Sequence, residues 1–169
     1  MNSRNNHNDT NTAKALFDHA DELWDQGKLR PAFDLFVEAA NAGDVGAEQN
    51  VGYFYDRGIG VRRNRMKALH WYMRAYKHGY ATAATNIGTV WRDSRELRRA
   101  LAWFQRAVKM GDDDANLEIA KYYVQCGSNP EKAIPFLRNV RRSRKVSESS
   151  IEEAERLLKE VQGKQKAQN

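Results

Sequence analysis

An internal repeat constrains this chain more than any other feature of its sequence. Two kinds of twelve-residue block alternate along residues 16–144, and each kind occurs four times. The first copies of the two kinds read LFDHADELWDQG (16–27) and AFDLFVEAANAG (32–43). Spacing between successive pairs of blocks is constant, whereas the connector inside each pair varies in length. A repeat of this kind predicts stacked helical hairpins, each of which buries its apolar face against its neighbours.

Both kinds of block have a helical pattern of apolar residues. In the second kind, apolar residues occupy positions 1, 4, 5 and 8, which form one stripe along a helix. Glycines 43, 79 and 111 follow this stripe, where a helix commonly ends in a left-handed residue. The first kind carries Gly52 and Gly88 at its sixth position, which predicts a close approach of the partner helix. An aromatic residue follows three positions later and is expected to pack between the two helices: Trp24, Tyr55, Trp91 and Tyr123.

Composition limits the class of protein. A chain of 169 residues with 41% hydrophobic residues can fold around one core or a short array of repeats. A single cysteine excludes an internal disulfide and a cysteine-based structural zinc site. No stretch approaches 18 apolar residues and the first thirty residues lack an apolar signal segment. We therefore expect a cytoplasmic protein without a membrane span.

Charge is segregated along the chain. Residues 1–56 carry four basic and ten acidic residues, for a net charge of −6. Residues 57–145 carry twenty basic and seven acidic residues, for a net charge of +13. The middle of the chain is therefore basic enough to make polyanions plausible partners.

The segment GYFYDRGIGVRRNRMKALHWYMRAYKHG (52–79) resembles the Sel-one-like repeat, a relative of the tetratricopeptide repeat. Its matching positions are Gly52, Tyr55, Gly58, Gly60, Val61, Lys67, Ala68, Trp71, Tyr72, Ala75 and Gly79. The other three hairpins lack the Gly-x-Gly-Val connector and are more similar to plain tetratricopeptide hairpins. The resemblance covers about residues 13–144. It implies an all-α fold, a right-handed α-solenoid of four helix-turn-helix repeats.

The ends of the chain lie outside this resemblance. Residues 1–12 and 163–169 are polar and predict disordered tails on either side of the four-repeat solenoid at 13–146. Residues 147–162 predict a C-terminal capping helix, because solenoids need a terminal cover. Ser150 and Glu153 have the spacing of a capping box at its start. Pro135 lies inside the expected second helix of the fourth hairpin. We therefore expect that helix to start late or to kink.

No catalytic motif is present in the sequence. Nucleophile elbows, phosphate loops, dinucleotide fingerprints and zinc-binding helices are all missing. His70 and His78 are too far apart along one helix to share a metal, and Cys126 is expected to be a small buried filler. We therefore expect a protein that is not an enzyme and that has no catalytic residues, no metal and no cofactor.

A partner-binding groove is expected along the first helix of each hairpin. By resemblance to tetratricopeptide domains, these helices line a concave face that binds a protein or an extended peptide. The predicted groove residues are Gln49, Asn50, Tyr53, Asp56, Arg57, Thr85, Asn86, Thr89, Arg92 and Lys121, with Leu117, Glu118, Val124 and Gln125 beside Lys121. Asn50 and Asn86 share one repeat position, and their amides can each donate to and accept from a partner backbone. These features predict a non-catalytic interaction module, such as an adaptor, a regulator or a neutralising, immunity-type partner.

A basic outer strip supports an alternative function. It comprises Arg62, Arg63, Arg65, Arg98, Arg99, Arg106, Arg141 and Arg142. Exposed arginines can bind the phosphates of RNA or DNA, and they can equally serve to keep a protein soluble. The alternative is therefore a protein associated with nucleic acid through this strip.

Overall fold

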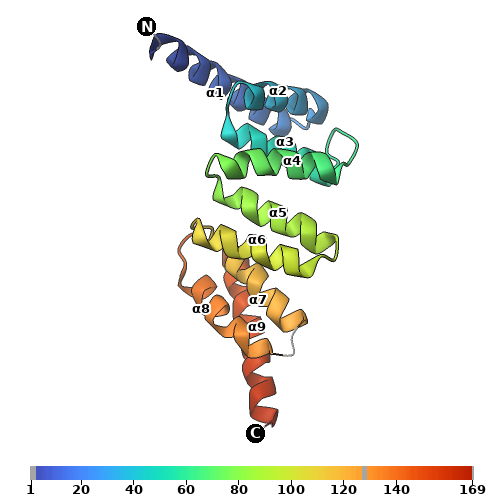
Figure 1. Cartoon of the computed structure of the whole chain (residues 1–169), viewed down its shortest axis with the longest axis vertical. Helices are drawn as coiled ribbons and strands as arrows, with labels where there is room; N and C mark the ends of the chain where they lie inside the picture. Colours follow the sequence, from blue (N-terminus) through green and yellow to red (C-terminus); the bar gives the residue numbers. More distant parts are fainter. Residues whose placement is uncertain (1–2, 127–128, 169) are drawn as a thin grey trace. The chain divides into compact units, whose positions relative to one another are not determined.

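The computed structural model describes residues 3–126 and 129–168 of the chain (Figure 1). Within these ranges the structure contains α-helices and one short 3-10 helix, and it contains no strand. The chain divides into two compact units, Met1–Ala83 and Ala84–Asn169, and the boundary falls inside one helix. The prediction of an all-α fold of four helical hairpins followed by a terminal helix is confirmed.

The first unit contains two antiparallel hairpins (Figure 1). The helices are α1 (Ser3–Asp25), α2 (Leu29–Asn41), α3 (Val45–Arg57) and α4 (Arg65–Lys77). Their apolar stripes meet in one core, in which Phe36 and Phe54 are completely buried with their ring centroids 5.7 Å apart. Trp24 packs against both rings. The prediction that the aromatic residue at this repeat position packs between helices is therefore confirmed for Trp24.

The second unit contains the remaining helices. They are most of α5 (Ala81–Asp93), then α6 (Leu97–Lys109), α7 (Ala115–Gln125), the 3-10 helix η1 (Pro130–Ala133), α8 (Ile134–Arg142) and α9 (Glu148–Gln168). The late start predicted from Pro135 is confirmed, because a 3-10 turn stands where the α-helix would otherwise begin. Proline lacks the backbone N–H that an α-helix needs beyond its first turn, so α8 is only nine residues long.

The last helix covers the fourth hairpin. Ala154, Leu157 and Leu158 of α9 lie in one buried cluster with Leu137 and Val140 of α8. The predicted capping helix is therefore present, and it packs on α7 and α8. Its cap differs from the prediction. The Ser147 hydroxyl accepts a hydrogen bond from the Ser150 N–H at 3.2 Å, so the capping residue is Ser147, three residues before the expected Ser150.

Both ends of the chain are more helical than the sequence predicts. Helix α1 begins at Ser3 and α9 ends at Gln168, whereas composition predicts disordered tails over 1–12 and 163–169. Extending an existing helix fixes only one more residue per hydrogen bond, so polar residues can continue a helix that packing has already nucleated. Among the residues whose burial the structure describes, Ala13 of α1 and Val161 of α9 are the buried ones nearest to the two ends.

Candidate functional site

A hollow of about 340 Å³ lies in the second unit, bordered by α5, α6, α7 and α9. It is lined by Arg92, Leu97, Ala100, Phe104, Glu118, Lys121, Tyr122, Gln125, Cys126 and Glu153. Four of these residues, Arg92, Glu118, Lys121 and Gln125, are among those that the repeat pattern places in a groove. The structure therefore brings predicted groove residues of the third and fourth hairpins together around one concavity.

The apolar part of the hollow comes from α6. Phe104 and Ala100 are each only 2% exposed, and Leu97 lies one turn before Ala100. Phe104 can lie this close to α5 because residue 88 is glycine: a Cβ atom there would be 2.5 Å from Cε1 of the ring. The small residue that the repeat carries at this position thus determines how deeply the aromatic side chain is seated.

An ion-pair network forms the polar rim of the hollow. Arg92 of α5 hydrogen bonds to Glu118 of α7, and Lys121 Nζ lies 3.4 Å from Glu118 Oε1. Lys121 Nζ also lies 2.8 Å from Glu153 Oε2, which joins α7 to α9. The Glu118 and Lys121 side chains are only 17% and 27% exposed, so these charges are held in a partly desolvated place. The network therefore links three helices before any partner is bound.

Arg92 is the charged residue most affected by this environment. Partial burial by itself would lower the pKa of its guanidinium, because desolvation disfavours the charged form. The charges of Glu118 and Asp93 and their hydrogen bonds outweigh burial, so the pKa of Arg92 lies above its ordinary value. Arg92 is consequently a fixed positive charge at the rim.

The first unit has its own set of predicted groove residues on α3. Tyr53 is half-buried, with its ring 5.9 Å from that of Trp24 and beneath the Arg57 guanidinium at 5.7 Å. Gln49 accepts a hydrogen bond of 2.9 Å from the Thr82 hydroxyl. Asn50 is half-buried, and its side chain forms no hydrogen bond with the described residues of its unit. Asn50, Tyr53 and Arg57 thus supply an amide, an aromatic ring and a cation on one helix.

In the second unit, Asn86 and Thr89 of α5 complete the predicted set. Both are half-buried. Over the part of the chain that the structure describes, the Asn86 amide has no hydrogen-bond partner within its unit.

Three predicted groove residues occupy other places. Asp56 is only 4% exposed, and its carboxylate lies 3.8 Å from the Arg63 guanidinium of the connector before α4. The Thr85 hydroxyl donates to the buried Asp112 carboxylate at 2.7 Å. Leu117 lies in the buried cluster beneath α9. Assigning helix faces by counting positions cannot detect that a polar side chain is used to fix a connector or a loop.

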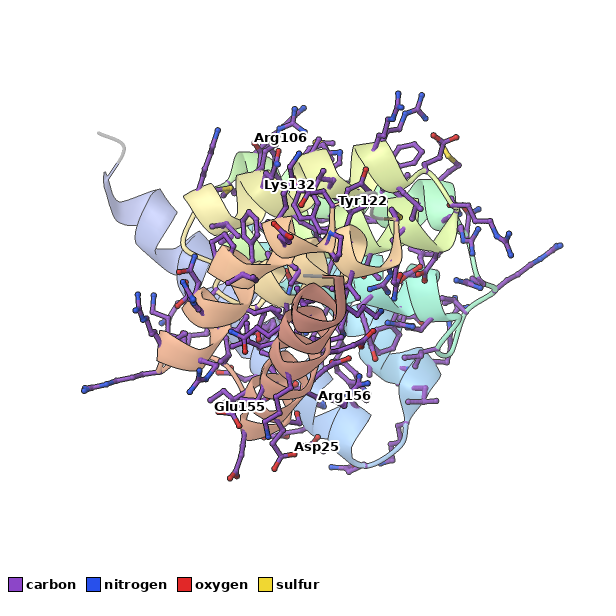
Figure 2. The ribbon with its side chains drawn as sticks, turned by 90° about the horizontal axis from the view of Figure 1, so that it is seen from below. Asp25, Arg106, Tyr122, Lys132, Glu155 and Arg156 are labelled. Carbon is purple, nitrogen blue, oxygen red and sulfur yellow. The ribbon has the colours of Figure 1, made fainter. Side chains whose placement is uncertain are left out.

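The arginines predicted as a basic outer strip are all exposed, but many of them have intramolecular contacts. Arg99 and Arg106 of α6 lie over the rings of Trp91 and Trp103, at 4.9 Å and 4.5 Å. Arg141 of α8 pairs with Glu155 of α9 at 3.1 Å. Figure 2 labels Arg106 and Glu155, whose side chains project outward from the second unit. Arg62, Arg63 and Arg65 belong to the first unit.

The sequence analysis missed two functional candidates. Cys126 is exposed and lines the hollow, so the prediction of a buried filler is wrong. Glu153 enters the hollow from the terminal helix, although its position was interpreted only as part of a capping box. Acidic residues on the apolar side of a covering helix are a usable signal, because such residues need a basic partner on the surface they cover.

The described residues contain no candidate membrane span and no candidate metal site. None of the helices they form is both long enough and apolar enough to cross a bilayer. No group of three His, Cys, Asp or Glu side chains among them is placed to hold a metal ion.

Comparison with known proteins identifies the repeat. The Sel1 repeat family model matches residues 45–80 and 92–112. A sel1-like repeat-containing protein L21 of Acanthamoeba polyphaga mimivirus is 27% identical over 98 residues, which cover 58% of this chain and 18% of that protein. The F-box protein At1g70590 of Arabidopsis thaliana is 35% identical over 88 residues, covering 51% of this chain and 24% of that protein. The chain therefore spans less than a quarter of the length of these relatives.

Solved structures agree with this assignment. A Sel1 repeat protein from Oxalobacter formigenes superposes with a TM-score of 0.64 at 25% identity, covering 78% of this chain and 57% of that chain. A tetratricopeptide repeat protein from Parabacteroides merdae superposes with a TM-score of 0.67 at 16% identity, covering 91% and 61%. The repeat period, the glycine-seated aromatic residues, the family match and these folds lead to one conclusion. The chain carries Sel1 repeats at residues 45–80 and 92–112 within a helical-repeat fold similar to those of solved Sel1 and tetratricopeptide repeat proteins.

Proposed function

We propose that this protein is a non-catalytic interaction module that binds another protein, as an extended segment, at the hollow of the second unit. The observation that carries the proposal is the rim of Arg92, Glu118, Lys121 and Glu153, held in one network beside the buried ring of Phe104. A polar rim around an apolar floor is the usual anatomy of a protein-binding site. Sel1 repeats generally form interaction scaffolds without catalytic activity, which supports the same class of function.

The chemistry of the hollow suits a peptide backbone. Its volume of about 340 Å³ lies within the range of ligand-binding concavities. Gln125 is exposed at its edge and offers both a donor and an acceptor. Tyr122 is half-buried and provides a large contact area with few rotatable bonds. Because basic and acidic side chains balance at the rim, we infer a partner segment of mixed polarity.

The groove residues outside the hollow extend the proposed contact in each unit separately. Asn50, Tyr53 and Arg57 would contribute in the first unit, and Asn86 and Thr89 in the second. Tyrosine and arginine are the residue types most often found at energetic hot spots, and the two amides have no partner within their own units among the described residues. Roles as an adaptor, a regulator or a neutralising partner in the cytoplasm all fit this mode of binding.

Affinity capture followed by variant analysis tests the proposal. The full chain is immobilised, proteins that bind it are identified by mass spectrometry, and the strongest binder is purified. The double variant Tyr122→Ala, Gln125→Ala should weaken its binding by about 1–3 kcal/mol through lost contacts at the rim. The control is Lys132→Ala with Arg142→Ala, two exposed residues outside the hollow. Equal binding by the two double variants, with unchanged circular dichroism, would contradict the proposal.

Binding of nucleic acid is the alternative that the arginines raise. Stacking of Arg99 and Arg106 on tryptophans and pairing of Arg141 with Glu155 favour the interpretation that these residues cover the surface and keep it soluble. A filter-binding titration with random RNA and DNA at low salt distinguishes the two. Binding that falls steeply with added salt would support the alternative, and no binding at low salt would remove it.

A further inference from the structure

A second hollow, in the first unit, has a different chemistry. It measures about 450 Å³ and lies between the start of α2, the end of α3 and the connector that leads into α4. The lining residues are Arg30, Phe33, Tyr55, Val61, Arg62, Arg63, Asn64 and Lys67. Four of these residues are cationic and none is acidic, in contrast to the balanced rim of the hollow in the second unit.

Aromatic side chains form the floor beneath these cations. The rings of Phe33 and Tyr55 meet edge to face with their centroids 5.2 Å apart, and Phe33 is only 5% exposed. Lys67 Nζ lies 5.1 Å from the centre of the Tyr55 ring, and the Arg30 guanidinium lies 5.7 Å from that of Phe33. The two cations are therefore oriented by the aromatic floor.

The connector that forms one wall is firmly held. The Asn64 N–H donates to the Tyr55 carbonyl at 2.8 Å, and Arg63 Nε donates to the Asp56 carbonyl at 2.6 Å. The Asn64 side chain caps α4 by accepting from the Lys67 N–H at 3.0 Å. Gly60 has a φ of +63° and lies so close to α2 that a Cβ atom would be 2.9 Å from the Leu29 carbonyl. The wall is thus built by specific contacts of the connector.

Two of the four cations have no acidic partner among the residues that the structure describes. Arg30 pairs with Asp34 at 3.1 Å, and Arg63 pairs with the buried Asp56. Arg62 and Lys67 form no ion pair with any acidic residue that the structure describes. Met66, which precedes Lys67 at the start of α4, is outside the lining of the hollow and is 75% exposed, so it offers an apolar contact to a segment that extends beyond the hollow. Lys67 over the aromatic floor, Arg62 in the same lining and the exposed Met66 together complement a segment that is both acidic and apolar.

We propose that the connector hollow of the first unit binds an acidic segment of a partner protein that carries an apolar residue among its carboxylates. Arg62 and Lys67 pair with its carboxylates, and Met66 contacts its apolar side chain. Arg30 and Arg63 already use their Nε atoms within the chain, so they are less suited to the bidentate clamp that a phosphate favours. This proposal concerns a surface separate from the hollow of the second unit and stands without it.

Binding of a defined peptide tests the proposal with the full chain. A fluorescent peptide of four glutamates around two leucines is titrated by anisotropy, and the affinity is compared for the wild type and for Arg62→Gln with Lys67→Gln. We expect the double variant to bind about tenfold more weakly, because two charge pairs at a rim are lost. The matched control, Lys132→Gln with Arg142→Gln, removes the same charge from exposed sites of the second unit and should bind like the wild type.

A second measurement locates the peptide. In amide NMR spectra of the full chain, the peptide should shift signals of residues 61–67 and leave those of residues 115–125 unchanged. Equal weakening by the control variant, absence of binding, or shifts confined to residues 115–125 would each overturn the proposal. A competition experiment gives a further test, in which inorganic phosphate, a single-stranded oligonucleotide and a hexaglutamate peptide each displace the fluorescent peptide. If phosphate or the oligonucleotide competes at a lower concentration than hexaglutamate, the hollow is a phosphate site and the proposal is overturned.

Discussion

The ring of Phe104 lies against the backbone at Gly88, where a Cβ atom would be 2.5 Å from Cε1 and 2.6 Å from Cδ1. Gly52 and Tyr72 repeat this relationship in the first unit, with a Cβ atom 2.6 Å from the tyrosine ring. A glycine in the middle of a helix lowers the stability of that helix. Its presence at both positions indicates that packing of the aromatic ring against the glycine compensates for this loss.

Replacing Gly88 with leucine should destabilise the second unit. The new side chain would displace Phe104, which is 2% exposed and cannot move into solvent without losing its burial. We expect a loss of about 1–3 kcal/mol in the free energy of unfolding, typical of overpacking. Urea denaturation followed by circular dichroism measures it.

Asn86→Leu is the matched control for this change. Asn86 lies on the same helix and is half-buried, without a side-chain hydrogen bond to the described residues of its unit. It should change stability by less than about 0.5 kcal/mol, as surface substitutions do. Equal losses at both positions would show that the helix faces are assigned incorrectly.

Arg74→Ala should be strongly destabilising. Glu48 is completely buried, and its Oε1 lies 2.9 Å from Arg74 Nη2 without forming a hydrogen bond of good geometry, while its Oε2 lies 2.9 Å from His78 Nδ1. Removing one partner of a buried ion pair costs about 3–5 kcal/mol, because the remaining charge is left in a poorly solvated place. The thermal midpoint of unfolding, measured by calorimetry, should fall.

Arg99→Ala provides the control for the loss of an arginine. Arg74 and Arg99 each lie over a tryptophan ring, at 4.4 Å and 4.9 Å. Within the described part of the chain, however, the acidic partner of Arg99 is only the exposed Glu96, at 3.9 Å. Its removal should cost no more than about 1 kcal/mol. If both variants melt at the same temperature, the stabilisation comes from the stacking on tryptophan and not from the buried ion pair.

Leu157→Ala on α9 should weaken the cover of the fourth hairpin. Leu157 is 6% exposed within the cluster that includes Leu137 and Val140. Such a truncation costs about 2–5 kcal/mol, and deletion of residues 147–169 should additionally lower solubility by exposing this cluster. Glu155→Ala, on the outer side of the same helix, should change the free energy of unfolding by less than about 1 kcal/mol. A Leu157→Ala protein as stable as Glu155→Ala would mean that α9 does not dock.

Alkaline pH should destabilise the protein through Tyr72. This side chain is 1% exposed, and burial, followed by the charge of Asp56, raises the pKa of its phenol well above the ordinary 10.0. Above pH 10 the unfolded chain loses this proton while the folded chain keeps it, so stability falls as pH rises. Tyr72→Phe should lose less stability than the wild type between pH 9 and about 11 in thermal unfolding. Parallel declines in the two proteins would contradict this assignment.

The hairpins were predictable because the repeat supplies four examples of one pattern. Gly88 marked the close approach, and Pro135 marked the late start of α8. The ends of the chain are more helical than predicted. A polar composition indicates that a free segment is costly to order, but extending a helix that is already packed costs less. The start of α9 was misplaced because Ser147 and Ser150 are both good N-cap residues, and only geometry distinguishes them.

The candidate site was predictable only in part. Repeat positions placed Arg92 and Lys121 on a common face, and the structure joins them through Glu118. The same counting placed Asp56 in the groove, although its carboxylate is buried against the connector. The sequence could indicate that Glu153 needs a basic partner, but it could not identify Lys121 as that partner, because it does not determine where a covering helix will pack.

Site-specific crosslinking tests the central claim most directly. A photoreactive amino acid is introduced at Gln125, at the edge of the hollow, or at Arg106, on the exposed side of α6. Each protein is mixed with the purified partner and irradiated, and crosslinked product is quantified by electrophoresis. The account predicts efficient crosslinking from residue 125 and only background from residue 106. Crosslinking from residue 106 with only background from residue 125 would contradict it and would identify the basic outer strip as the working surface.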